Sequence, residues 1–286
     1  MAIHLPYFDA LLKRLEEGHP NFTRAFGRHV HWGYWPDPTQ ANGSPEDFAQ
    51  AAERLARLIY EAAEVQSEER VLDAGCGFGG TLGSLNRRFK GMKLVGLNLD
   101  PRQLHRAKRE VLATFGNRLH WIQGNACTLP FADESFDVVL AVECIFHFPS
   151  RTRFFKEAYR VLRPGGRLAL SDFVPKPALR SVMRIGLYRT GFYGRCDFRY
   201  TLENYLHLAE ACGFVLVWFE DITVNTLPTY RFLKTLGKDL PSKRFVAALE
   251  TGFAEWVSRM GGLRYLVMAF KKLESSAYDF ERGPKR

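Results

Sequence analysis

The side chains with the clearest chemical potential lie in or after three apolar segments of the chain. The first segment, residues 70–80, contains Asp73 and then glycines at positions 75, 77, 79 and 80. Backbone without Cβ atoms can turn sharply and touch a ligand, and a carboxylate beside that turn suits a cationic group. The other two segments precede His147 and Asp172, whose side chains can accept a proton. A positioned general base typically contributes ~10²–10⁴-fold to a rate.

The glycine spacing restricts the kind of ligand. Gly75-x-Gly77-x-Gly79 is not the G-x-G-x-x-G spacing of dinucleotide sites, and no Lys-Ser or Lys-Thr pair follows, as it would in a P-loop. Val71 and Leu72 precede the turn, and residues 81–90 have a helical pattern. The sequence therefore predicts a strand, a tight turn and a helix start that together form a seat for a cofactor.

Composition sets outer limits on the function. The chain has 286 residues, 46% of them hydrophobic, enough for one large domain with a full core. It has no run of about 18 apolar residues and no secretory signal pattern, so we expect no membrane span. The five cysteines lack C-x-x-C spacing, which argues against a disulfide framework or a zinc site and favours a cytoplasmic protein. The net charge of +9 favours anionic partners of any kind.

Apolar segments alternate with helical patterns along most of the chain. Strand patterns begin near residues 70, 93, 120, 135 and 167, and the helices between them predict a doubly wound α/β fold with a parallel sheet. Ser44 and Pro45 indicate a helix start. We expect a single domain over 1–286, with an N-terminal helix and lid at 1–43 and a cofactor-binding core at 44–174. Helical cap segments are expected at 175–212 and 223–262.

The stretch D-A-G-C-G-F-G, from Asp73 to Gly79, resembles motif I of class I S-adenosylmethionine-dependent methyltransferases. The resemblance is strong over residues 30–175 and weak elsewhere. It implies S-adenosyl-L-methionine as the cofactor, with Asp73, Gly75 and Gly77 beside it. It also implies a Rossmann-like methyltransferase fold with a seven-stranded, mostly parallel sheet, in which 214–220 is the sixth strand and 264–270 is a final antiparallel strand.

The next motif departs from the usual pattern of that family. G-L-N-L-D-P-R-Q has Asn98, followed by Leu99, where most class I enzymes have an acid that binds the ribose. This resembles the branch with cyclopropane-mycolate synthases and tocopherol and sterol methyltransferases, in which a Gln, here Gln103, helps to bind the cofactor. An amide can accept from one hydroxyl and donate to another. Asp100 is the alternative ribose ligand, and it could equally be a helix cap.

Three further positions are implied by the same resemblance. G-N-A-C-T-L-P-F is similar to the family's adenine-binding motif, with Asn125 in place of an acid and Ala126 supplying a backbone amide. The aromatic segment 29–36 is similar to a lid over the cofactor in tocopherol-type and antibiotic-sugar methyltransferases, with Tyr34 as its contact, although it could be a purely hydrophobic strap. Glu143 is placed near the cofactor by its position in the chain.

Methyl transfer from a sulfonium requires mainly alignment, but a hydroxyl acceptor also needs a base. His147 and Asp172 resemble a pair that flanks the acceptor in antibiotic-sugar (rebeccamycin-type) O-methyltransferases. The alternatives are that His147 binds backbone and that Asp172 caps a turn. Glu143 could orient His147 or meet the acceptor.

The acceptor itself is less defined by the sequence. Arg180, Arg184 and Tyr188 lie in a basic and aromatic segment that is either a solvated face or a site for an anionic group. We expect a small-molecule acceptor, most simply a hydroxyl of a natural product or lipid-like secondary metabolite. The alternatives are C-methylation of an anionic prenyl or polyketide substrate and a non-methylating, cyclase-like relative. A nucleic-acid methyltransferase is disfavoured, because no RNA-binding module or N-P-P-Y-type motif is present.

Overall fold

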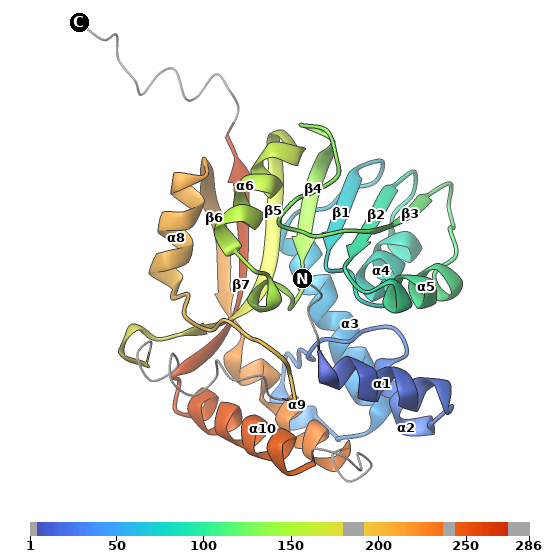
Figure 1. Ribbon diagram of the computed structural model, residues 1–286, viewed down its shortest axis with the longest axis vertical. Coiled ribbons are helices and arrows are strands. Elements are labelled where there is room, and N and C mark those ends of the chain that lie inside the picture. Colours follow the sequence, from blue (N-terminus) through green and yellow to red (C-terminus); the bar gives the residue numbers. More distant parts are fainter. Residues whose placement is uncertain (1–4, 180–191, 237–243, 274–286) are drawn as a thin grey trace, which may run out of the picture.

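One of the most apolar stretches of the chain forms the centre of the molecule. All 6 residues of β4 (Phe136–Ala141) are buried, as expected for a parallel strand covered on both faces. The computed structural model describes residues 5–179, 192–236 and 244–273. It places β4 in a 7-stranded sheet with the order β3-β2-β1-β4-β5-β7-β6 (Figure 1).

The sheet is parallel except at one side. The other strands are β1 (Arg70–Ala74), β2 (Lys93–Asn98), β3 (Arg118–Gln123), β5 (Leu162–Pro175), β6 (Phe214–Asp221) and β7 (Leu263–Lys272). Strands β1 to β5 pair in parallel, whereas β7 runs antiparallel to both β5 and β6. The predicted doubly wound, mostly parallel seven-stranded sheet with a final antiparallel strand is therefore confirmed.

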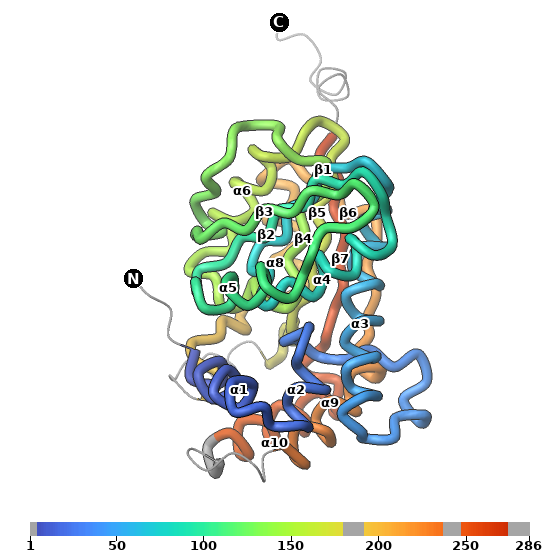
Figure 2. Tube along the Cα trace, turned by 90° about the vertical axis from the view of Figure 1, so that its right-hand side faces the viewer, coloured from blue at the N-terminus to red at the C-terminus, as the bar shows by residue number. Residues whose placement is uncertain are grey.

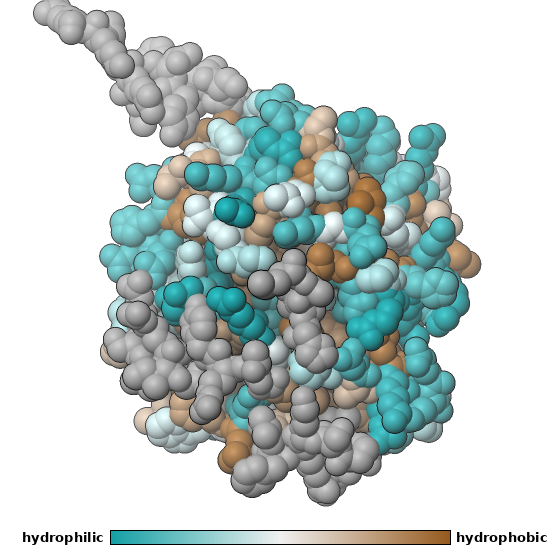
Figure 3. All heavy atoms as spheres, viewed as in Figure 1, coloured by the Kyte–Doolittle hydropathy of each residue, from teal (hydrophilic) through white to brown (hydrophobic). Residues whose placement is uncertain are grey.

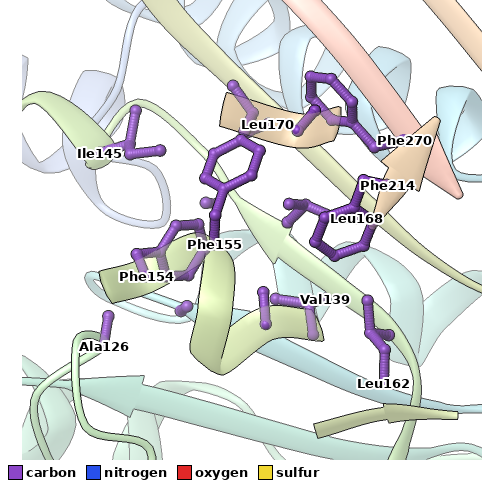
Figure 4. Close-up of a cluster of buried hydrophobic side chains, with 14 of the residues drawn as sticks. Ala126, Val139, Ile145, Phe154, Phe155, Leu162, Leu168, Leu170, Phe214 and Phe270 are labelled. Carbon is purple, nitrogen blue, oxygen red and sulfur yellow. The ribbon is translucent and has the colours of Figure 1, made fainter. Parts of the chain in front are cut away.

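Helices cover both faces of the sheet through two buried clusters. On one face, α3 (Pro45–Ala62) and α4 (Gly80–Arg88) share a core with the inner side chains of β1, β4 and β7. On the other face, α6 (Arg151–Val161) and α8 (Leu202–Ala211) pack on the sheet around Phe154 and Phe155 (Figure 4). Helix α5 (Pro101–Glu110) packs against β2 and β3. Hydrophilic side chains cover much of the face in Figure 3, so most large apolar side chains lie inside.

Local capping signals start several of these helices where the sequence predicts. The Ser44 hydroxyl accepts a hydrogen bond from the Asp47 amide, and Pro45 is the first residue of α3. Ser150 caps α6 in the same way, and Asp100 caps α5. Each cap satisfies an amide that has no partner within its own helix. The predicted helix start at Ser44 and Pro45 is confirmed.

A separate layer of helices lies beyond the carboxyl ends of the parallel strands (Figures 1 and 2). It contains α1 (Pro6–Glu16), α2 (Pro20–Phe26), α9 (Thr223–Leu236) and α10 (Arg244–Arg259). Phe8, Leu11 and Leu15 of α1 share a buried cluster with Phe232 of α9. Helices from the N-terminal segment and from the segment between β6 and β7 therefore build one cap. Three short 3-10 turns complete the described elements, at Pro38–Gln40, Ile145–His147 and Pro177–Leu179.

Two segments differ from the sequence prediction. The segment 175–212 was expected to be cap, but its residues 202–211 form α8, which packs against α6 and β6 because Tyr205, Leu208 and Ala209 are buried there. Strand β5 starts at Leu162, not near residue 167, since Leu162 already pairs with Phe136. Among the residues that the structure describes, no helix is both long and apolar enough to cross a bilayer.

The cluster in Figure 4 generates a test of stability. Phe155 is fully buried, and its ring lies 5.6 Å from that of Phe270 and 6.0 Å from that of Phe214. We expect Phe155→Ala to lower the free energy of unfolding by about 3–5 kcal/mol, because a cavity remains in a packed core. Leu112→Ala, at a position that is 71% exposed, is the control and should change it by less than about 0.5 kcal/mol. Denaturant titration measures both, and equal losses would contradict the assignment.

Candidate active site

The glycine turn after β1 is crowded by protein atoms. Gly75 and Gly77 have φ values of 90° and 54°, which L-residues with a Cβ rarely adopt. A Cβ on Gly77 would lie 2.7 Å from Cγ2 of Val30, and one on Gly75 would lie 2.8 Å from Sγ of Cys144. The missing side chains therefore make room for neighbouring segments of the chain as well as for a ligand.

A cavity of about 460 Å³ opens beside this turn. It lies at the carboxyl ends of the parallel strands, the edge where α/β sheets bind ligands. Every predicted cofactor residue except Tyr34 lines it, namely Asp73, Gly75, Gly77, Asn98, Leu99, Gln103, Asn125, Ala126 and Glu143. The structure thus brings together residues that are spread over four strands.

Asp73 carries the best evidence that a cation belongs in this cavity. Its side chain is only 1% exposed, and its Oδ1 atom has no hydrogen-bond partner. Burial raises the pKa of Asp73 to about 7. A buried acceptor of this kind is costly unless something pairs with it. The ammonium group of S-adenosylmethionine would supply that partner, so the residues present fit the expected cofactor.

The two predicted amides of the second motif form a pair. Asn98 donates from Nδ2 to Oε1 of Gln103 over 2.8 Å, and its own Oδ1 accepts from the Leu99 amide. Asp100 also lines the cavity, but its carboxylate caps α5 and binds the Arg102 guanidinium at 2.6 Å. The charge of Asp100 is therefore already engaged, which leaves the amide pair as the better candidate for neutral hydroxyl groups.

Asn125 and Ala126 lie in the turn that follows β3. The Asn125 side-chain carbonyl accepts a hydrogen bond from the Cys127 amide over 2.9 Å, so this oxygen helps to fold its own turn. A carbonyl oxygen has a second lone pair, which remains for a ligand amino group. Ala126 is buried and contributes backbone to the cavity wall.

The segment 28–35, which we call the strap, closes one side of the cavity. His29, Val30 and His31 line it, and the Trp32 amide donates to the Glu143 carboxylate over 2.9 Å. Tyr34 does not line the cavity. Its amide binds the Ala51 carbonyl of α3, and its ring packs on the core that α3 shares with the sheet. The structure thus does not support the predicted contact of Tyr34 with the cofactor, and Val30 occupies the position over the glycine turn instead.

A buried histidine pair fixes the strap to α3. Nδ1 of His31 lies 2.9 Å from the Trp32 carbonyl, which can only accept, so His31 Nε2 accepts from His29 Nδ1 over 3.0 Å. His29 Nε2 then faces Glu53 at 2.9 Å. Burial alone would raise the pKa of Glu53, but hydrogen bonds from His29 and Ser84 lower it to about 2. The ionised Glu53 carboxylate accepts from His29 Nε2 and so ties the strap to α3.

A second cavity of about 400 Å³ lies under the cap. Its wall is mainly aromatic, with rings from the strap, the 3-10 turn after β4, β5, the loop before α8 and the cap, namely Trp32, Phe146, Phe173, Phe198 and Tyr230. Some residues line both cavities, namely Tyr7, Val30, His31, Glu143 and His147. The two cavities therefore adjoin at these side chains.

His147 stands at this junction with one ring nitrogen engaged. Its Nδ1 lies 3.1 Å from the Arg195 carbonyl, so Nδ1 carries the proton and Nε2 keeps its lone pair. Burial lowers the pKa of His147 to about 4. The ring is therefore neutral near pH 7, the state that can accept a proton.

Glu143 lies beside His147 with its carboxylate held by two donors. Oε2 accepts from the Trp32 amide and, over 2.5 Å, from the Tyr265 hydroxyl. Burial raises the pKa of Glu143 to about 8. A cation in either cavity would favour its ionised form.

Asp172 does not face either cavity. The carboxylate is fully buried and binds Arg151 at 2.8 Å, the Tyr205 hydroxyl and the Phe173 amide. The structure therefore contradicts the predicted contact of Asp172 with the acceptor. Sequence reasoning missed its partner, because Arg151 looks like an ordinary residue in the first turn of a helix. The predicted acceptor residues Arg180, Arg184 and Tyr188 lie outside the described residues.

The chain is similar to known methyltransferases. A family model described as a methyltransferase domain matches residues 72–170. The chain is 36% identical to methyltransferase GfsG of Streptomyces halstedii over 71% of its length and 72% of that protein. It is 35% identical to 27-O-demethylrifamycin SV methyltransferase of Amycolatopsis mediterranei over 54% of its length and 55% of that protein.

Solved structures show the same fold at lower identity. The cyclase SpnF superposes with a TM-score of 0.72 at 22% identity, covering 94% of each chain. A geranyl diphosphate C-methyltransferase from Streptomyces coelicolor A3(2), solved with Mg²⁺, geranyl diphosphate and S-adenosyl-L-homocysteine, has a TM-score of 0.68 at 20% identity. That match covers 96% of this chain and 100% of the other.

The buried carboxylate of Asp73 predicts proton release on cofactor binding. With a pKa of about 7, Asp73 is partly protonated at neutral pH, and a bound ammonium group should lower that pKa. Binding of S-adenosylhomocysteine should therefore release protons at pH 6–7, and affinity should rise with pH from about 5 to 7. Calorimetry in buffers of different ionisation enthalpy measures this. Asp73→Asn should weaken binding and remove the Asp73 contribution, and an unchanged proton count in the variant would contradict the assignment.

The contact between the strap and the glycine turn predicts a rescue. Gly77→Ala adds a Cβ 2.7 Å from Val30 at a φ of +54°, so we expect at least a ~10-fold loss of S-adenosylhomocysteine affinity, about 1.4 kcal/mol. Adding Val30→Ala should recover part of it by removing the clash. Gly116→Ala, at a φ of +74° with nothing within 4 Å, is the control for backbone strain and should leave the affinity unchanged. If Val30→Ala gives no recovery, the added methyl acts on the ligand instead.

Proposed function

The chain belongs to the methyltransferase-domain family and uses S-adenosylmethionine, and we propose that it methylates a hydroxyl group of a natural product or lipid-like small molecule. The observation that carries this proposal is the meeting of two cavities at His147 and Glu143. One cavity has the buried acid and the amides that suit the cofactor. The other has an aromatic wall that suits an apolar acceptor.

The chemistry divides between the cofactor and the protein. S-adenosylmethionine supplies a methyl group already activated by its positive sulfur. The chain contributes alignment: Asp73 would hold the ammonium group, and Asn98 with Gln103 would hold the ribose hydroxyls. His147 Nε2 would take the proton of the acceptor hydroxyl, while Nδ1 stays bonded to the Arg195 carbonyl.

The lining of the second cavity favours a neutral or cationic acceptor over an anionic one. Among the described residues, the ionisable acids on its wall are Glu143 and Glu250, and Lys234 is engaged in an ion pair with Glu255. This lining therefore disfavours an anionic prenyl substrate, which the C-methylation alternative requires. The cyclase alternative rests on a structural likeness at 22% identity, which speaks for the fold alone. A roofed cavity of about 400 Å³ suits a small molecule and not a nucleic-acid strand.

The proposal also concerns where in the cell the enzyme works. We place the enzyme in the cytoplasm because all five cysteines are free thiols, as expected in a reducing environment.

A direct test uses S-adenosylmethionine with a labelled methyl group. Incubation with phenolic, sugar-bearing, prenyl-diphosphate and amine acceptors, followed by mass analysis, distinguishes O-, N- and C-methylation. We expect label on an oxygen of an apolar acceptor. Label confined to a carbon or nitrogen would refute the hydroxyl proposal while leaving methyl transfer intact.

His147 as the base predicts a selective loss of turnover. His147→Ala should reduce the turnover number by ~10²-fold or more, because a general base typically contributes ~10²–10⁴-fold, while cofactor affinity stays within about twofold. His207→Ala, at an exposed histidine on α8, is the control and should leave both unchanged. With a pKa of about 4, the base stays unprotonated as pH falls from 8 to 5, so the wild-type turnover number at saturating cofactor should decline only below that range. A midpoint near 6.5 would contradict the burial of this ring.

A further inference from the structure

The loop that binds His147 comes from a distant part of the chain. Besides the bond from His147 Nδ1 to the Arg195 carbonyl, the Asp197 amide donates to the Phe146 carbonyl over 2.8 Å. Cys196 Sγ lies 3.8 Å from the same Nδ1. Residues 195–197 therefore hold both the ring of His147 and the backbone just before it.

This loop has no regular secondary structure, and the Arg151 side chain is one of its anchors. The Arg151 guanidinium donates from Nη2 to the Asp197 carbonyl over 2.6 Å, and its Nη1 lies 3.4 Å from the Asp197 carboxylate. It also lies 4.6 Å from the ring centroid of Tyr200, within cation–π range. Arg151 thus binds the loop at Asp197 through charge and a hydrogen bond, and it contacts the ring of Tyr200 just after the loop.

Arg151 is in turn held from the sheet side. Nη2 binds the Asp172 carboxylate at 2.8 Å, and Nε donates to the Tyr205 hydroxyl at 2.8 Å. The Tyr205 hydroxyl also donates to Asp172, which accepts from the Phe173 amide as well. The side chains of Arg151 and Asp172 are 1% and 0% exposed, so water does not compete for them. A buried guanidinium without its carboxylate would be a costly unpaired charge.

We propose that Asp172 and Arg151 are positioning residues for methyl transfer, which hold the 195–197 loop so that the Arg195 carbonyl keeps the proton of His147 on Nδ1. The chain of contacts runs from β5 through α6 to the loop and ends at the base. Asp172 thereby acts on a proton acceptor that it does not touch. The inference rests on the proposed role of His147, but its effect on the ring can be measured without any methyl transfer.

The test compares three changes at this network. Asp172→Asn keeps the shape of the side chain and removes its charge. Tyr205→Phe removes one bridge and leaves both charges, which makes it the milder variant if Asp172→Asn fails to fold. Glu69→Gln is the matched control, because Glu69 pairs with Arg167 at the other end of β5 and has no part in the loop.

Long-range ¹H–¹⁵N spectra of ligand-free protein report which nitrogen of His147 carries the proton. We expect the wild type and Glu69→Gln to show the Nδ1–H form, and Asp172→Asn and Tyr205→Phe to shift toward a mixture of tautomers or toward protonation. An unchanged His147 spectrum in both network variants would overturn the proposal. If no acceptor is ever methylated, the proposed function fails while this result still stands or falls by itself.

The turnover number gives a second test of the positioning role. Asp172→Asn should lower the turnover number at least ~10-fold, within the ~10²–10⁴-fold of a general base, with cofactor affinity within about twofold. In a His147→Ala background, the same change should lower turnover by less than about twofold, because the residue through which it acts is gone. Equal losses in both backgrounds would show that Asp172 acts independently of His147 and would refute the positioning role.

Discussion

The close approach of the strap to the glycine turn is the contact on which the site depends. Val30 packs where a Cβ of Gly77 would lie, and His29 lies where a Cβ of Gly80 would lie. The strap then continues to Trp32, whose amide binds Glu143 at the end of β4. One short segment therefore fixes the wall of the first cavity and the border of the second. Neither cavity would have its present shape if this backbone approach were prevented.

Two buried acids in the first cavity suit a positively charged ligand. Asp73 and Glu143 are both buried, and burial raises the pKa of each, to about 7 and about 8. Hydrogen bonds from Trp32 and Tyr265 stabilise part of the charge of Glu143, but burial outweighs them. A cationic ligand would supply further stabilisation, so the two acids would favour a ligand that carries positive charge.

The sequence predicted what depends on local chemistry. Strand periodicity, the Ser44 cap and the glycine turn all involve neighbouring residues, and the fold followed from them. Tyr34 and Asp172 were misplaced because their environment depends on residues far along the chain. The partner of Asp172 is Arg151, and the residue over the glycine turn is Val30, about 47 positions before Gly77. α8 was assigned to the cap because a helical pattern alone does not say which surface buries its apolar face.

The N-terminal helix α1 touches both cavities: Phe8 borders one, Leu11 borders the other, and Tyr7 borders both. Its outer tie to α5 is the ion pair between Asp9 and Arg102, whose side chains are 41% and 57% exposed, and such surface pairs are weak and sensitive to salt. Displacement of this one helix would expose both cavities to solvent at the same time. Loading and release of the two ligands would then use one opening, and higher ionic strength would weaken one of the contacts that keep it closed.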